Sequence, residues 1–174
     1  MQVSADDLAG TFYFYRSMGI EKDINQVKFK SARQKAMLNV LFSYGWITEK
    51  IKQLLAPEDI TPQQYNILRI LRGANQPIST LQIRERMLDK MSDTSRIVDR
   101  LIVKGLVEKR ICERDKRLVD VFITEKGRTL LKEMDSDAEQ MDKLLQNISE
   151  EEAGQLNHLL DTARQKTEAE VEAG

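Results

Sequence analysis

The chain has 174 residues, a formal net charge of −1, one cysteine and one histidine, and this length fits one domain or one domain with an extension. No run of about 18 apolar residues occurs, which excludes a membrane-spanning helix, and a single cysteine excludes an internal disulfide and is typical of a reducing compartment. The acidic start, MQVSADDLAG, lacks the basic and then apolar pattern of a signal peptide, so we expect a cytoplasmic protein without membrane contact.

Residues 1–27 are expected to form an N-terminal extension. They contain four adjacent aromatic residues, Phe12 to Tyr15, which one helix face cannot hide together. We therefore expect some of them to pack on another element or another subunit. An arm that staples a dimer is the favoured interpretation, and a special binding function is the alternative.

Residues 28–59 are expected to form the first long helix, over 28–55, and the turn that follows it. Apolar residues make two neighbouring stripes, one of Met37, Val40, Leu41, Tyr44, Ile47, Ile51, Leu54 and Leu55, the other of Leu38, Phe42 and Trp46. A helix that is apolar on two sides is buried on two sides. Core and dimer packing explains such stripes more often than a ligand site does.

Residues 60–124 have the element order of a winged helix-turn-helix. Thr61 and Gln64 have capping-box spacing around Pro62, and Ser79 and Gln82 repeat that spacing at the next helix. Ile78 is expected to add a short strand. The helix after Ser79 is expected to bury Leu81, Ile83, Met87 and Leu88.

The helix that begins at Ser92, which we expect to be its N-cap, is the predicted recognition helix. One face is mainly apolar and is expected to pack on the core; it holds Thr94, Ile97, Val98, Leu101 and Ile102. The other face is polar apart from Val103; it holds Ser92, Ser95, Arg96, Asp99 and Val103. Gly105 is suited to the left-handed position that closes a helix.

A hairpin wing is expected next, with strands over 106–112 and through Val119, Val121 and Ile123. Its tip, residues 113–117, holds three cations among five residues. Residues 60–126 carry 14 Lys and Arg against 9 Asp and Glu, a net charge of +5, whereas the remainder carries −6. A basic middle in an acidic frame favours nucleic-acid binding by one module.

Residues 125–174 are predicted to be dimerisation helices. Thr124 is the expected cap of a long helix that runs to about residue 147, and Ser149 with Glu152 forms a capping box for the last helix. Helices this long lack partners within one small subunit, so we expect a homodimer with two-fold symmetry.

Three motifs together resemble the MarR family of winged-helix transcription regulators: SRIVDRLIVKGLVEKR (95–110), RDKR (114–117) and VDVFITEKG (119–127). Asp115 and Arg117 fit the family's D-x-R wing signature, and Ile123 replaces its leucine. The resemblance implies a mainly α fold with a small β wing (α+β), flanked by long dimerisation helices.

Double-stranded DNA is the partner that these features predict. Two recognition helices of a dimer enter successive major grooves, so the operator is expected to be a pseudo-palindrome. We expect Ser92, Ser95 and Arg96 to contact base edges and Arg100 a phosphate; the wing contacts are expected from Arg114, Lys116 and Arg117. The resemblance further implies that Asp99 pairs with Arg117 and fixes the wing angle.

A small aromatic or anionic ligand is also implied, because MarR-like proteins bind such effectors between the first helix, the next one and the dimerisation helix. Phe42, Trp46 and Tyr65 are the candidate pocket walls. We expect a repressor whose DNA affinity such a ligand lowers. The alternative is a winged-helix adaptor for proteins, without sequence-specific DNA binding.

Catalysis has little support in the sequence. His158 has no nucleophile or carboxylate near it at a catalytic spacing, and no phosphate loop, dinucleotide motif or metal-ligand cluster occurs. We therefore expect no enzyme activity, cofactor or metal. Cys112 is interpreted as a small packed residue, with a redox sensor beside Arg110 and Arg114 as the minority alternative.

Overall fold

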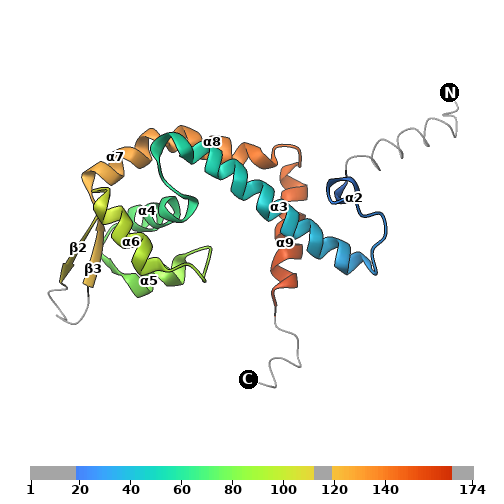
Figure 1. The fold of residues 1–174 in the computed structure, drawn as a ribbon, viewed down its shortest axis with the longest axis horizontal. Helices are drawn as coiled ribbons and strands as arrows, with labels where there is room; N and C mark the ends of the chain where they lie inside the picture. Colours follow the sequence, from blue (N-terminus) through green and yellow to red (C-terminus); the bar gives the residue numbers. More distant parts are fainter. Residues whose placement is uncertain (1–18, 112–118, 166–174) are drawn as a thin grey trace, which may run out of the picture. The chain divides into compact units, whose positions relative to one another are not determined.

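A computed structural model describes residues 19–111 and 119–165, so the aromatic cluster at 12–15 and the wing tip at 113–117 lie outside the described residues. The chain divides into two compact units between Tyr65 and Asn66. Helices dominate both units, and three short strands form one antiparallel sheet. The mainly α fold with a small β wing is therefore confirmed (Figure 1).

The first unit is built on helix α3, Ala32–Leu55. Its start differs from the predicted residue 28, because Ser31 is the N-cap: the Ser31 hydroxyl accepts from the Gln34 amide at 3.1 Å. A short helix α2, Ile20–Asp23, precedes it and was not predicted. Ile20 is buried, and Glu21 pairs with Lys35 of α3 at 2.6 Å.

Helix α3 leaves many of its apolar residues exposed in the single chain, whereas Leu55 at its end is buried. Both predicted stripes contribute, through Met37, Val40, Leu41, Phe42, Tyr44 and Trp46. A turn of 3-10 helix, η1 (Ala56–Glu58), follows, and helix α4 (Pro62–Ala74) begins with the predicted capping box. The Thr61 amide donates to Gln64 Oε1 at 3.0 Å, and the Gln64 amide donates to Thr61 Oγ1 at 3.2 Å.

The second unit contains the helix-turn-helix and its sheet. The elements after α4 are β1 (Ile78–Ser79), α5 (Thr80–Arg86), α6 (Thr94–Val103), β2 (Val107–Ile111) and β3 (Val119–Ile123). The sheet order is β1-β3-β2, with Ile78 opposite Val121 and Val107 opposite Ile123. The short strand at Ile78 is therefore confirmed.

Apolar residues from every element of the winged helix form one core. They are Ile67, Leu68, Leu71, Ile78, Ile83, Met87, Val98, Leu101, Leu106, Val107, Val121 and Ile123. Helices α5 and α6 pack against each other, and α6 also contacts β2. The core thus fixes the inner face of α6 and leaves its other face open.

Two residues that were predicted to be buried by the helix after Ser79, Leu81 and Leu88, are exposed. Ser79 and Gln82 form the predicted capping box, but α5 ends at Arg86, and Met87 already has an extended backbone. The helical spacing that would have buried Leu88 therefore ends before it, and Leu88 is 89% exposed. Leu81 is also exposed, because it lies on the outer side of the first turn.

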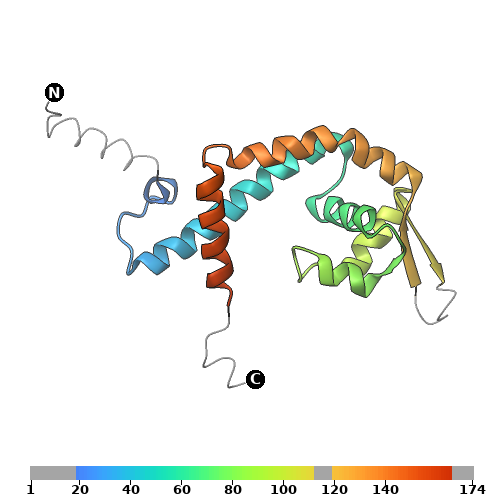
Figure 2. The ribbon, with the colours of Figure 1, turned by 180° about the vertical axis from the view of Figure 1, so that it is seen from behind.

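The predicted helix from Thr124 to residue 147 is interrupted. Helix α7 (Glu125–Glu133) ends near Met134, and α8 (Asp135–Asp142), the 3-10 turn η2 (Lys143–Leu145) and α9 (Glu150–Ala163) follow. Thr124 caps α7, and Ser149 with Glu152 forms the capping box of α9, as predicted. In Figure 2 the sheet is seen from behind, with the strand β3 continuing into α7.

Gly127, in the first turn of α7, allows a close approach to the backbone of Leu106, just after the end of α6. A Cβ atom at this position would lie 2.4 Å from the Leu106 carbonyl oxygen and 2.9 Å from Ile123 Cγ1. Both neighbours belong to the core, so neither can move at little cost. Glycine is therefore required here by packing.

We predict that Gly127→Ala lowers the free energy of unfolding by about 1–3 kcal/mol, the usual cost of overpacking. Chemical denaturation measures the effect. The control is Gly154→Ala in α9, where a Cβ meets nothing within 4 Å, and alanine is expected to stabilise the helix by up to about 1 kcal/mol. Equal effects of the two substitutions would contradict the close approach.

Candidate nucleic-acid interface

Helix α6 has one buried and one exposed face, as its sequence predicts. Thr94, Val98 and Leu101 are buried. The opposite face exposes Ser95, Arg96, Asp99, Arg100 and Val103. A helix held through its inner face, with small and cationic side chains outward, has the form of a major-groove reader.

The N-cap of α6 is Asp93, so the prediction of Ser92 was wrong. Asp93 Oδ1 accepts from the Arg96 amide at 3.1 Å. The Ser92 hydroxyl instead donates to Asp89 Oδ2 at 2.7 Å. Serine and aspartate cap helices about equally well, and the bond to Asp89 explains why the aspartate has this role here.

Side chains hold the turn between α5 and α6. The Leu88 amide donates to Asn66 Oδ1 of α4 at 3.2 Å, and the Met91 amide donates to Asp89 Oδ1 at 3.0 Å. Leu88 and Met91 themselves are 89% and 93% exposed. Hydrogen bonds to the backbone, more than apolar burial, therefore determine the path of the chain into α6.

The C-terminal end of α6 is closed by a Schellman motif. Gly105 has a φ of 69°, the Leu106 amide donates to the Leu101 carbonyl at 3.0 Å, and the Gly105 amide donates to the Ile102 carbonyl at 2.8 Å. Thr124 Oγ1 also donates to the Gly105 carbonyl at 2.8 Å. This end of the helix is thus joined to the start of α7.

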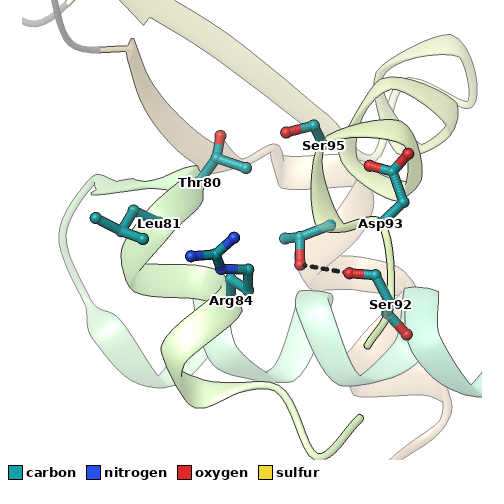
Figure 3. A pocket seen from close by; sticks show the side chains of 7 residues that line it. Thr80, Leu81, Arg84, Ser92, Asp93 and Ser95 are labelled. Atoms are coloured by element: carbon teal, nitrogen blue, oxygen red, sulfur yellow. Dashed lines mark hydrogen bonds between the residues drawn. The ribbon is translucent and has the colours of Figure 1, made fainter. Parts of the chain in front are cut away.

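A cleft of about 270 Å³ separates α5 from the start of α6. Its walls are Thr80, Leu81 and Arg84 on one side and residues 92–95 on the other (Figure 3). Thr94 Oγ1 donates to the Ser92 carbonyl at 3.4 Å, the bond drawn in that figure. Arg84 was not among the site residues predicted from the sequence. Its place one turn after Thr80, on the helix before the recognition helix, could have indicated it.

The described cations fall into paired and unpaired groups. Lys109 of β2 pairs with Asp99 of α6 at 2.6 Å. Arg110 pairs with Glu108 at 2.7 Å and stacks over Phe122, 5.0 Å from the ring centroid. Within residues 19–111 and 119–165, no ion pair is formed by Arg84, Arg96 or Arg100, and all three are exposed. These three arginines of α5 and α6 are thus available to a phosphate.

Several predicted site residues lie outside the described residues. They are Arg114, Asp115, Lys116 and Arg117 of the wing, together with Cys112. The pairing of Asp99 with Arg117 therefore stays a prediction. Among the proposed ligand-wall residues, Phe42 and Trp46 lie one turn apart on α3 and are exposed, whereas Tyr65 of α4 is buried.

The winged helix matches a known family. The model of the MarR family matches residues 58–118, which include the turn and both helices just described. The HTH-type transcriptional regulator MhqR of Bacillus subtilis (strain 168) is 27% identical over 120 residues, which make up 68% of this chain and 81% of MhqR. The winged helix of this chain is of the MarR family. The chain is a transcription regulator of the DNA-binding, winged helix-turn-helix type.

Two solved structures of DNA-binding proteins share the fold. A mutant MarR from E. coli complexed with operator DNA is 24% identical, with a TM-score of 0.63, over 75% of this chain and 96% of that one. BpsR of Bordetella bronchiseptica, whose DNA binding is regulated by 6-hydroxynicotinic acid, is 20% identical, with a TM-score of 0.70, over 81% of this chain and 100% of that one. Among the described helices there is no apolar stretch of the length that a membrane span requires.

The Asp89 carboxylate is stabilised in the folded protein. The Ser92 hydroxyl and, second, the Met91 amide hold the pKa of Asp89 below its ordinary value. A depressed pKa in the folded state contributes stability above the unfolded-state pKa, and this contribution is lost as the pH falls through the folded-state pKa. The turn into the recognition helix is therefore linked to the charge of Asp89.

We predict that Asp89→Ala lowers the free energy of unfolding at neutral pH and that its difference from the wild type shrinks as the pH falls below the ordinary aspartate pKa. The reason is that the wild type loses the same bonds once Asp89 is protonated. Urea denaturation across this pH range measures the effect. The destabilisation by Ser92→Ala, which removes the main cause, is expected to shrink in the same window; a difference independent of pH would contradict the linkage.

Proposed function

We propose that this protein is a homodimeric repressor that binds a pseudo-palindromic operator and releases it when a small ligand binds. The observation that carries the proposal is the outer face of α6, where Ser95 and the unpaired Arg96 are exposed beside a cleft with Arg84 on its other wall. An arginine can donate two hydrogen bonds to guanine in the major groove. The complex of E. coli MarR with operator DNA supports a DNA partner for this face.

The contacts divide into two kinds. Ser92, Ser95 and Arg96 are assigned to base edges at the start of α6. Arg84, Arg100 and the wing cations Arg114, Lys116 and Arg117 are assigned to the backbone or the minor groove, where narrow A·T tracts attract arginine.

Each segment of the chain is assigned a role within the predicted boundaries. Residues 60–124 bind DNA, 28–59 and 125–174 form the dimer, and 1–27 are an extension of the dimer. The exposed apolar stripes of α3 support the dimer, since water-exposed apolar residues in such number mark a contact surface. In a two-fold dimer the recognition helices lie about 34 Å apart, one turn of DNA.

The ligand is assigned to the aromatic side chains Phe42, Trp46 and Tyr65, and its class is a small aromatic or anionic molecule. The regulation of BpsR by 6-hydroxynicotinic acid supports this class. A ligand shifts DNA affinity only by its differential affinity for two arrangements of the recognition helices. Trp46, the one tryptophan of the chain, makes intrinsic fluorescence a direct readout of ligand binding.

We predict that Arg84→Ala weakens binding to operator and random duplexes alike and lowers the slope of log affinity against log salt by about one, because each neutralised phosphate contributes about 0.9. Fluorescence anisotropy over a salt series measures the slope. Arg110→Ala is the control, since Arg110 is already paired with Glu108, and its slope is expected to equal that of the wild type. A wild type that binds no duplex at any salt concentration would favour a protein-interaction adaptor.

We predict that Arg96→Ala lowers the ratio of operator to random-duplex affinity by roughly tenfold or more, because a lost bidentate contact removes discrimination at one base pair. Lys116→Ala is expected to weaken all duplexes similarly, as a phosphate contact does. The operator is first obtained by selection from random duplexes. Equal and uniform losses from both changes would show that the reading face is misassigned.

We predict that Leu41→Glu, in the exposed stripe of α3, shifts the protein from dimer to monomer, because an unpaired carboxylate is costly to bury. Sedimentation velocity at several concentrations measures the mass. Ser43→Glu introduces the same charge on the same helix outside the stripe and is expected to leave the dimer intact. A monomeric wild type would refute the dimer.

A further inference from the structure

Asp93 is an acid at the entrance of a face proposed to meet DNA. Helix α6 and its cap carry two aspartates, and they differ in their surroundings. Asp99 is neutralised by Lys109 at 2.6 Å. Asp93 is exposed and forms no ion pair with any residue of 19–111 or 119–165. Its negative charge is therefore not neutralised within the described part of the chain.

Only one oxygen of Asp93 has a bonding partner in the described part of the chain. Oδ1 accepts from the Arg96 amide at 3.1 Å and caps the helix. The other oxygen has lone pairs available to a donor from outside. Capping requires one acceptor oxygen and no charge, since asparagine and serine cap as well as aspartate does. The charge adds a favourable interaction with the N-terminal end of the helix dipole, but this interaction does not occupy the second oxygen.

Neighbouring groups make this edge of α6 rich in hydrogen-bond acceptors. The Ser92 hydroxyl already donates to Asp89 at 2.7 Å, and the Thr94 hydroxyl donates to the Ser92 carbonyl at 3.4 Å. Outward, the side chains of this edge offer the free oxygen of Asp93 and the lone pairs of Ser92, beside the backbone amides that a helix start leaves without intrahelical partners. The unpaired donor Arg84 stands on the opposite wall of the cleft (Figure 3).

DNA presents two kinds of partner to such an edge. Phosphates carry negative charge and only accept hydrogen bonds, so a carboxylate repels them. The exocyclic amino groups of cytosine and adenine donate hydrogen bonds in the major groove, and carboxylates accept from cytosine N4 in known complexes. A carboxylate without an ion-pair partner is thus favourable next to a base amino group and unfavourable next to a phosphate.

We propose that Asp93 is a specificity-determining residue: its free oxygen accepts from the amino group of a cytosine or adenine, and its charge disfavours every register that places a phosphate there. This inference rests on the proposed DNA binding by α6. It assigns Asp93 two effects, discrimination at one base pair and weaker binding to random DNA. Selective binders commonly combine an attractive contact with a repulsive one in this way.

The experiment separates the cap from the charge. Asp93→Asn and Asp93→Ser keep a capping oxygen and remove the charge, whereas Asp93→Ala removes both. Glu151→Gln in α9 removes one negative charge far along the chain and controls for net charge. The melting temperature of each variant is measured first. Asp93→Asn and Asp93→Ser, which lose only the interaction with the helix dipole, are expected to lower it less than Asp93→Ala does.

Affinities for the selected operator and for random duplex are then measured by anisotropy. Asp93→Asn and Asp93→Ser are expected to bind random duplex about two- to threefold more tightly, the size expected for one unit charge several ångströms from a phosphate in water. Selection with Asp93→Asn is expected to relax the preference at one base pair by about five- to tenfold. The wild type should bind more weakly to an operator whose adenine or cytosine at that position lacks the amino group, whereas the affinity of Asp93→Ser should not change.

The two possible failures are distinguishable. If the wild type selects an operator and Asp93→Asn selects the same one with the same affinity for random duplex, Asp93 is a helix cap only and the inference is overturned. The inference is also overturned if Glu151→Gln reproduces the gain on random duplex. If the wild type binds no duplex, the proposed function fails, and the inference fails with it.

Discussion

The junction between the end of α6 and the start of α7 is the contact on which the geometry of the interface depends. The Thr124 hydroxyl donates to the Gly105 carbonyl at 2.8 Å, and Lys126 Nζ donates to the Lys104 carbonyl at 2.9 Å. These bonds satisfy carbonyls that a helix end leaves without partners. Because Gly127 has no side chain, the two backbones approach until only hydrogen fits between them. The predicted recognition helix α6 is thereby attached to α7, the helix that follows the sheet.

The two ends of α6 are held by different means. Its C-terminal end is closed by backbone bonds beside the buried Leu101 and Leu106. Its N-terminal end depends on exposed hydrogen bonds that backbone amides donate to side-chain oxygens of Asn66, Asp89 and Asp93. Exposed bonds with little apolar burial open at lower free energy than a packed core does. The end proposed to contact DNA is therefore the more adaptable one, while the C-terminal end keeps its orientation.

Local patterns of the sequence were sufficient to predict most of the fold. The capping boxes at Thr61, Ser79 and Ser149 are confirmed. They could be predicted because each depends only on two residues three positions apart in the sequence. What the sequence could not reveal depends on competition between neighbours. Ser92 and Asp93 are both good caps, and the bond to Asp89 decides between them. Arg84 belongs to a cleft between two helices, and no periodicity within one helix predicts such a cleft.

The exposed turn has a practical consequence. Leu88 and Met91 bury little of their surface, while their amides provide the bonds that order the turn. Replacing either side chain leaves those amides in place. A fluorophore or spin label attached at Met91 would therefore sit a few residues from the reading helix and report the arrival of a duplex with little perturbation of the scaffold.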